Sequence, residues 1–215
     1  MPSEPSLRER LIDAGVDLVL TEGSASVGLR EIARRAGVSH GAPRRHFPTH
    51  HALLSAIAQR GFEELTGRFA AVIAETTTPR AQLRAVARVY VTYTLERRSM
   101  FELMFRHDLL DSDRHAAGER KLRESSLPQF ARVVDLVARC RAEPDTAQGP
   151  GSREPYAPPV VAAALWANLH GIAQLWVQGS LPLALGSPEG GVPGGDQLDR
   201  LIAAALDAHL GPVDA

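Results

Sequence analysis

Apolar residues recur every three or four positions along most of this chain, and that periodicity restricts its fold more than any other feature. Between residues 7 and 18 the positions Leu7, Leu11, Ala14 and Leu18 would share one face of a helix. Similar spacing returns in residues 50–75, 79–94 and 196–210. No alternating apolar run is long enough to indicate a sheet. The sequence therefore predicts an all-α fold.

The predicted helices divide the chain into a short and a long part. The first fifty residues hold three short helices, which we expect to form a small domain of residues 1–50. Residues 51–215 hold five or six longer helices and form a larger helical body. Two stretches rich in proline, glycine and polar residues, 142–155 and 180–195, are predicted to be loops.

Composition narrows the classes of protein that remain. The formal net charge is −1, so nucleic-acid binding would need a local excess of positive charge. A single cysteine, Cys140, excludes an internal disulfide framework and a metal site of several cysteines. We find no apolar run near the ~20 residues of a membrane helix. The first ten residues also lack a signal-peptide pattern, so we expect a cytoplasmic protein without a membrane partner.

A local excess of positive charge does occur, in residues 28–51. Five arginines against Glu31 leave a net charge of five minus one, or +4, with four histidines in addition. In the same stretch one predicted helix closes at Gly37 and the next begins at Ser39, which caps it. Two helices joined this tightly form a helix-turn-helix, whose second helix can enter the DNA major groove.

The second of these helices has distinct inner and outer positions. Val38, Pro43 and Phe47 are predicted to face the core, which places His40, Gly41, Arg44 and Arg45 on the outer face. The small Gly41 and Ala42 would let the helix backbone approach base edges. Arg44 or Arg45 bound to guanine through two hydrogen bonds would contribute about 1–3 kcal/mol of discrimination.

Other interpretations of these residues were weighed. An arginine pair on a helix usually just meets water. His46 and His50 could share a face, but a helix boundary at Pro48 separates them and no carboxylate or cysteine completes a metal set. A metal hydrolase would use carboxylates and histidines of the kind that lie close together here, although a solvated helix start explains them better; they are Asp108, Asp111, Asp113, His107 and His115. We predict neither a metal, a cofactor nor an enzyme, and keep a helical scaffold without DNA binding as an alternative.

The stretch "LREIARRAGVSHGAPRRHFPTHHALLSAIA" resembles the TetR family of bacterial transcriptional repressors. The match rests on Ile32-Ala33, Ala36-Gly37-Val38-Ser39, Gly41, His46-Phe47-Pro48 and Ala52-Leu53. Arg44 stands where the family usually has tyrosine, His50 where it has lysine, and Gly28 where it has threonine. With a histidine in place of lysine, phosphate affinity here is expected to depend on pH. The residues predicted to contact DNA are Arg30, Ser39, His40, Gly41, Ala42, Arg44, Arg45, Thr49 and His50.

The resemblance extends to the helical body through Trp166, His170 and Gly171, which fit the C-terminal domain of one subgroup. It implies a homodimer through the last two helices and a repressor that a small apolar or aromatic effector releases from a palindromic operator. The effector would be unknown and the DNA double-stranded. His170 would offer a polar handle or bond a backbone carbonyl. The predicted pocket residues are Tyr90, Tyr93, Phe101, Met104, Phe105, Phe130, Trp166 and His170.

Overall fold

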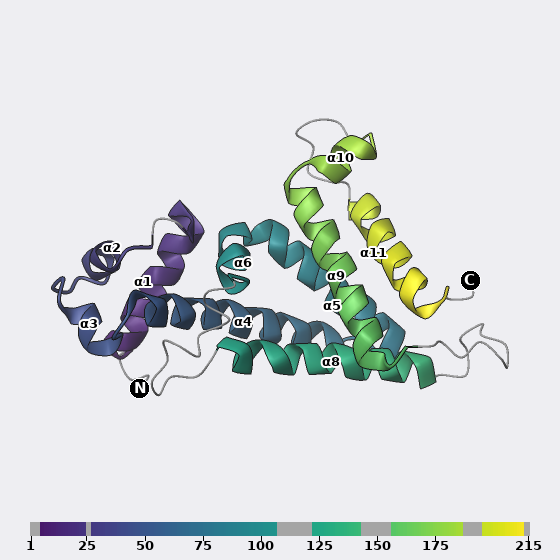
Figure 1. Cartoon of the computed structure of the whole chain (residues 1–215), viewed down its shortest axis with the longest axis horizontal. Coiled ribbons are helices and arrows are strands. Elements are labelled where there is room, and N and C mark those ends of the chain that lie inside the picture. The colour runs from purple at the N-terminus through teal and green to yellow at the C-terminus, as the bar shows by residue number, and fades with distance from the viewer. Residues whose placement is uncertain (1–4, 25–26, 107–121, 143–155, 187–194, 213–215) are drawn as a thin grey trace. The chain divides into compact units, whose positions relative to one another are not determined.

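The computed structural model describes residues 5–24, 27–106, 122–142, 156–186 and 195–212 (Figure 1). Within these ranges every regular element is a helix, which confirms the predicted all-α fold. The helices are α1 (Leu7–Glu22), α2 (Leu29–Arg35), α3 (Ala42–His46), α4 (His50–Ala74), α5 (Pro79–Glu96), α6 (Arg98–Met104), α8 (Leu122–Ala142), α9 (Pro158–Val177), α10 (Ser180–Ala184) and α11 (Gly195–Leu210).

Residues at the helix ends explain where α1 begins and ends and where α4 begins. The Ser6 hydroxyl accepts from the Glu9 backbone N–H at 3.3 Å, and the Glu9 carboxylate accepts from the Ser6 N–H at 2.9 Å, which forms a capping box. Gly23 ends α1 with a φ of +90°. The Thr49 hydroxyl accepts from the Ala52 N–H at 3.0 Å and caps α4. These boundaries agree with the expected ones.

The short helix α3 begins later than expected. Ser39 was predicted to be its N-cap, but Gly41 occupies that position and the Ser39 carbonyl accepts from the Ala42 N–H in a preceding turn. Pro43 has no N–H and is therefore favoured in the first turn of a helix, which is where it lies. The connection from α2 thus runs from Ala36 to Gly41, with Gly37 at a φ of +67°.

The sequence also predicts that Ser99 caps a short apolar helix and that Pro128 interrupts a later one, and both predictions are wrong. Ser99 does not cap α6, because the break in the helix falls at Arg97 and Ser99 lies in the first turn. Pro128 does not interrupt α8, which runs past it. The later turns of α8 bury Leu136, Val137 and Cys140, and this packing outweighs the hydrogen bond that the proline removes. The sequence further predicts that this later helix starts at about Asp113, a position outside the described residues.

The chain packs into two compact units. Unit 1 comprises residues 1–64 and 97–127, and unit 2 comprises residues 65–96 and 128–215. The chain passes between the units inside α4, between α5 and α6, and inside α8, and α6 packs with α1. The sequence predicts a domain boundary after residue 50, where the helix-turn-helix motif ends. This boundary remains a prediction.

In unit 1, two glycines let helices approach closely. A Cβ at Gly15 of α1 would overlap the Ile57 side chain of α4. A Cβ at Gly61 of α4 would lie 2.6 Å from the Met104 sulfur of α6. Helices α1, α4 and α6 therefore share one tightly packed core, on which α2 and α3 are mounted beside α1 (Figure 1).

In unit 2, α9 packs against α5, α10 and α11. Its buried positions are Val161, Ala162, Leu165, Leu169, Ile172, Ala173 and Trp176. Contrary to the expectation from the sequence, one apolar run does approach membrane length, since α9 has 20 residues and a mean hydropathy of 1.4 over its most apolar window. A helix of the core of a soluble protein has the same composition, and one face of α9 is buried in this way.

Candidate nucleic-acid interface

Two of the five arginines in the helix-turn-helix bind carboxylates. Arg35 contacts Asp17 at 2.5 Å, Glu31 at 3.2 Å and the Glu22 carboxylate, so it ties α2 to α1. Arg34 pairs with Glu31 at 2.5 Å. Hydrogen bonds from Arg34, then Arg35, lower the pKa of Glu31 to about 2. Arg35 therefore helps to hold α2 on α1 and Arg34 is paired within α2, whereas the sequence counted both toward phosphate binding.

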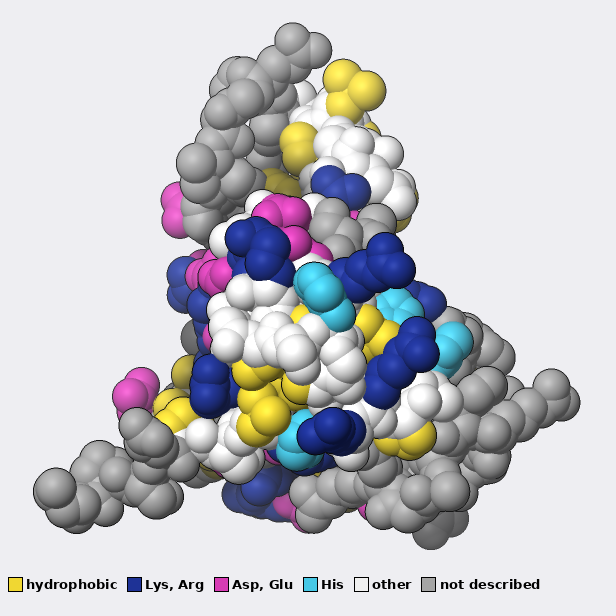
Figure 2. All heavy atoms as spheres, turned by 90° about the vertical axis from the view of Figure 1, so that its left-hand side faces the viewer, with side chains coloured by type: hydrophobic (Ala, Val, Ile, Leu, Met, Phe, Trp, Pro, Cys, Tyr) yellow, Lys and Arg dark blue, Asp and Glu magenta, His cyan; other side chains and the backbone are white. Residues whose placement is uncertain are grey.

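The recognition helix α3 exposes its arginines and buries its apolar residues. Arg44 and Arg45 are exposed, Pro43 is buried and Phe47 is 0% exposed. Arg30, Ser39, His40 and Gly41 are also exposed, while Ala42 and Thr49 are half-buried. Figure 2 shows arginine and histidine side chains gathered on the face that carries these helices. Exposed positive charge of this kind can bind DNA phosphates.

His50 is anchored to the chain ahead of α2. Its Nε2 lies 2.6 Å from the Val27 carbonyl oxygen, so the ring N–H donates there. His50 therefore joins the start of α4 to the start of the helix-turn-helix, a contact that its place in the sequence does not reveal.

Sequence reasoning missed two arginines on α1. The Arg10 Nη2 donates to the Ala36 carbonyl at 2.7 Å, at the point where α2 ends. The Arg8 guanidinium lies 5.1 Å from the centre of the Phe47 ring, at the end of α3. The sequence "LRER" could have indicated them, because its two arginines lie in the first turn of a helix that must pack on the helix-turn-helix.

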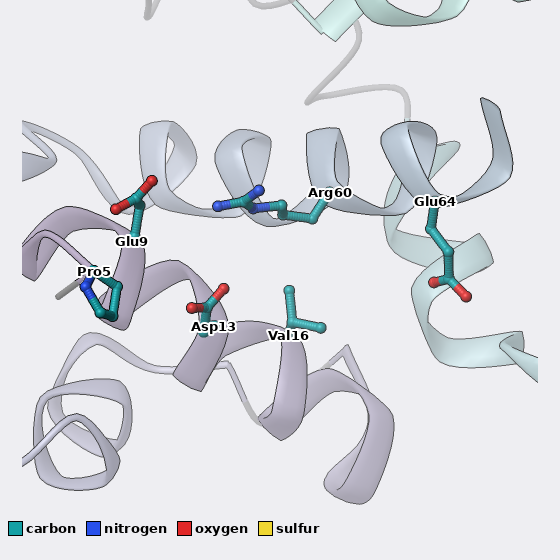
Figure 3. A pocket seen from close by; sticks show the side chains of 6 residues that line it. All are labelled: Pro5, Glu9, Asp13, Val16, Arg60 and Glu64. Atoms are coloured by element: carbon teal, nitrogen blue, oxygen red, sulfur yellow. The ribbon is translucent and has the colours of Figure 1, made fainter. Parts of the chain in front are cut away.

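A groove of about 550 Å³ lies between α1 and α4 in unit 1 (Figure 3). Pro5, Glu9, Asp13 and Val16 line it from the α1 side, and Arg60 and Glu64 line it from α4. Hydrogen bonds from Ser6 lower the pKa of Glu9. Three carboxylates make the groove acidic, in contrast to the face that carries α3, and none of the predicted pocket residues lies in it.

Three of the predicted pocket residues form a hydrogen-bonded cluster in unit 2. The Trp166 Nε1–H donates to the Tyr90 hydroxyl at 2.9 Å, and the Tyr90 oxygen lies 2.9 Å from the His170 Nδ1. With His170 neutral, the Tyr90 O–H donates to that nitrogen. Burial raises the pKa of Tyr90 and lowers the pKa of His170. His170 thus bonds a tyrosine rather than the backbone carbonyl considered above.

The other predicted pocket residues fall into both units. In unit 2, Phe130 packs on Trp166 with ring centres 6.2 Å apart, and Tyr93 is buried beneath Arg68. In unit 1, the Phe105 ring centre lies 4.6 Å from that of Phe101, and Met104 is buried beside them. The set therefore comprises an aromatic and polar group on α5, α8 and α9 and a second group on α6.

The fold and the exposed arginines of α3 define a helix-turn-helix DNA-binding regulator. Residues 11–57 match the bacterial regulatory proteins of the tetR family, and residues 83–208 match the tetracyclin repressor-like C-terminal domain. The chain therefore belongs to the TetR family of transcriptional regulators and is not an enzyme. Members of this family bind DNA operators and small-molecule effectors and form dimers.

Two transcriptional regulators are similar to part of this chain, which spans less than two thirds of the length of either. The chain is 27% identical over 132 residues to the HTH-type transcriptional activator FasR of Mycolicibacterium smegmatis, a match covering 61% of this chain and 59% of FasR. It is 33% identical over 86 residues to the HTH-type transcriptional regulator BetI of Rhizobium meliloti, covering 40% and 42%. A Rhodococcus sp. RHA1 protein of unknown function shares the fold over 100% of both chains, with a TM-score of 0.72 and 28% identity.

Proposed function

We propose that this chain is a repressor that binds a palindromic operator and leaves it when a small apolar or aromatic effector binds. The observation that supports this most directly is the contrast among its arginines. Arg34 and Arg35 bind carboxylates of α1 and α2, whereas Arg44 and Arg45 are exposed on the recognition helix. The proposed interface also includes Arg30, Ser39, His40, Gly41, Ala42, Thr49 and His50.

The proposed dimer forms through α9 and α11, the last two long helices. On α9 the large apolar residues Val160, Trp166 and Leu175 are 53%, 41% and 44% exposed, and Ala163, Ala164 and Ala167 lie exposed between them. Small residues let two helices approach closely, and a two-fold partner would cover this face. Two symmetric recognition helices then read two half-sites, which makes the operator palindromic. Such a protein acts on DNA in the cytoplasm.

The proposed effector site lies near the Tyr90, Trp166 and His170 cluster. Its aromatic rings would contact an apolar or aromatic molecule, and the hydrogen-bonding groups would orient it. Effector and operator binding weaken each other by the same factor, with a coupling of about 1–3 kcal/mol. The continuous helix α4, which begins at His50 and ends at Ala74, would carry the change between the units.

A second candidate is an activator, since FasR is named as one. The same interface would serve both functions, because the sign of regulation depends on where the operator lies relative to the promoter. The DNA-binding experiment tests both, and a reporter gene placed behind the recovered operator separates them by its rise or fall.

The test is selection of bound duplexes from a random-sequence library with the purified full chain, followed by footprinting. We expect an enriched inverted repeat and protection of both half-sites. A library that shows no enrichment even at low salt would contradict the proposal. Protection of a single half-site by a monomer would contradict its dimeric part.

A further inference from the structure

The first turn of α1 lies against the end of the recognition helix, and a capping box fixes where this turn begins. The Ser6–Glu9 capping box sets the start of α1, which puts Arg8 at the second helical position. There its guanidinium lies 5.1 Å from the centre of the Phe47 ring, within the range of a cation–π interaction. Phe47 is the C-cap of α3, and α1 also packs against α3.

This contact brings a positive charge to the C-terminal end of the recognition helix. Arg44 lies one turn earlier in α3, and the start of α4 at His50 follows within three residues of Phe47. A recognition helix in the major groove has phosphates at its flanks, and the helices before it contact the same backbone. Arg8 therefore lies next to residues of the proposed DNA interface.

Stacking on Phe47 is compatible with phosphate binding. A guanidinium stacks through its flat face, whereas phosphate oxygens bind the N–H donors along its edge. Arg8 is half-buried, which restricts the side chain and reduces the entropy lost when a phosphate binds.

We propose that Arg8 contacts a DNA phosphate, so that α1 is a third element of the nucleic-acid interface beside α3 and the start of α4. This inference rests on the proposed DNA binding. The competing role for Arg8 is a structural one, as a cover for Phe47. The two roles differ in a measurable way, because only a phosphate contact releases counterions from DNA.

The experiment measures binding of the full chain to a fluorescent mixed-sequence duplex over a series of salt concentrations. The duplex needs no known operator, since phosphates are present in every sequence. We expect Arg8→Gln to reduce the slope of log K against log salt by about 0.9 for each bound protomer. Arg8→Lys keeps the charge and should keep the slope. The control is Arg98→Gln, which removes an exposed arginine of unit 1 that pairs with Glu102 on α6.

Each outcome decides the matter. A smaller slope in Arg8→Gln, with the slopes of Arg8→Lys and Arg98→Gln unchanged, supports the phosphate contact. If Arg8→Gln weakens binding equally at every salt concentration, Arg8 is only structural and the inference fails while the proposed function stands. If the wild-type chain shows no salt-dependent binding, both fail. Circular dichroism establishes that each variant is folded, and an Arg8→Lys slope as low as that of Arg8→Gln would also overturn the inference.

Discussion

The α1–α3 region of unit 1 pairs arginines with carboxylates at the surface, whereas α5 of unit 2 buries the side chain of Tyr90. In unit 1, Arg35 bridges carboxylates of two helices while remaining 20% exposed. In unit 2, Tyr90 is 6% exposed and hydrogen-bonds with two side chains of α9. Surface charges can act on a partner at little cost in stability, while a buried hydrogen bond is costly to break. We therefore expect substitutions in the two regions to affect different measurements.

The largest expected effect comes from the apolar residue beneath the surface charges of unit 1. Phe47→Ala should reduce the free energy of unfolding by about 3–5 kcal/mol, because it leaves a cavity at a fully buried site. Chemical denaturation measures the change. Leu183→Ala is the control, since Leu183 is 77% exposed and should change stability by less than ~0.5 kcal/mol. Similar losses in the two variants would show that Phe47 does not anchor α3.

The next effect separates the arginines of the recognition helix from those paired with carboxylates. Arg44→Ala should weaken operator binding by about 1–3 kcal/mol if it removes a bidentate base contact, or roughly 5- to 150-fold. Arg34→Ala should weaken it less, because Arg34 is already bound to Glu31. Fluorescence anisotropy on the selected operator measures both. Equal losses would remove the distinction on which the proposed interface depends.

An effect of similar size, on stability rather than on DNA binding, is expected in the hydrogen-bonded cluster of unit 2. Tyr90→Phe keeps the ring and removes the hydroxyl that Trp166 and His170 contact. Stability should fall by about 1–3 kcal/mol, since the polar groups left behind lose a partner. Thermal and chemical unfolding would measure the loss, while operator affinity without effector should stay near the wild-type value. A wild-type stability in Tyr90→Phe would mean that water replaces the hydroxyl.

As the pH is lowered from neutral, the first loss of stability is expected to come from His170 in unit 2. Burial lowers the pKa of His170 below its ordinary value of 6.5. Below pH 6.5, His170 binds a proton in the unfolded chain but not in the folded chain. The free energy of unfolding should therefore decrease as the pH is lowered, until the pH drops below the pKa of His170 in the folded chain. His170→Asn should flatten this part of the profile. An unchanged profile in that variant would assign the effect to another group.

The smallest effect should appear in acid, in unit 1. Arg34 and Arg35 lower the pKa of Glu31 from 4.5 to about 2, so this carboxylate contributes stability at neutral pH that is lost as the pH falls between these values. Glu31→Gln should remove that contribution, and its unfolding profile should be less steep than the wild-type profile in this range. NMR titration of the Glu31 carboxyl gives the direct measurement, and an ordinary pKa there would show that the pairs do not form in solution.

Much of the fold follows from neighbouring residues in the chain. The helical periodicity, the capping box at Ser6 and the cap at Thr49 act within one or two turns, so they can be recognised in the sequence. The buried Phe47 and the exposed Arg44 also follow from helical spacing. Ser39, by contrast, has the composition of a cap, but the position of Pro43 in the first turn moves the helix start to Ala42.

The sequence by itself determined an all-α chain with a helix-turn-helix and an arginine-bearing recognition helix, because these depend on short-range spacing. Only the tertiary structure decided which arginines are paired, since Arg35 finds Asp17 eighteen positions away on another helix. It also brought Arg8 to Phe47, and Tyr90 to His170 across eighty positions. Such contacts depend on how helices pack, and a one-dimensional pattern contains no direct record of packing.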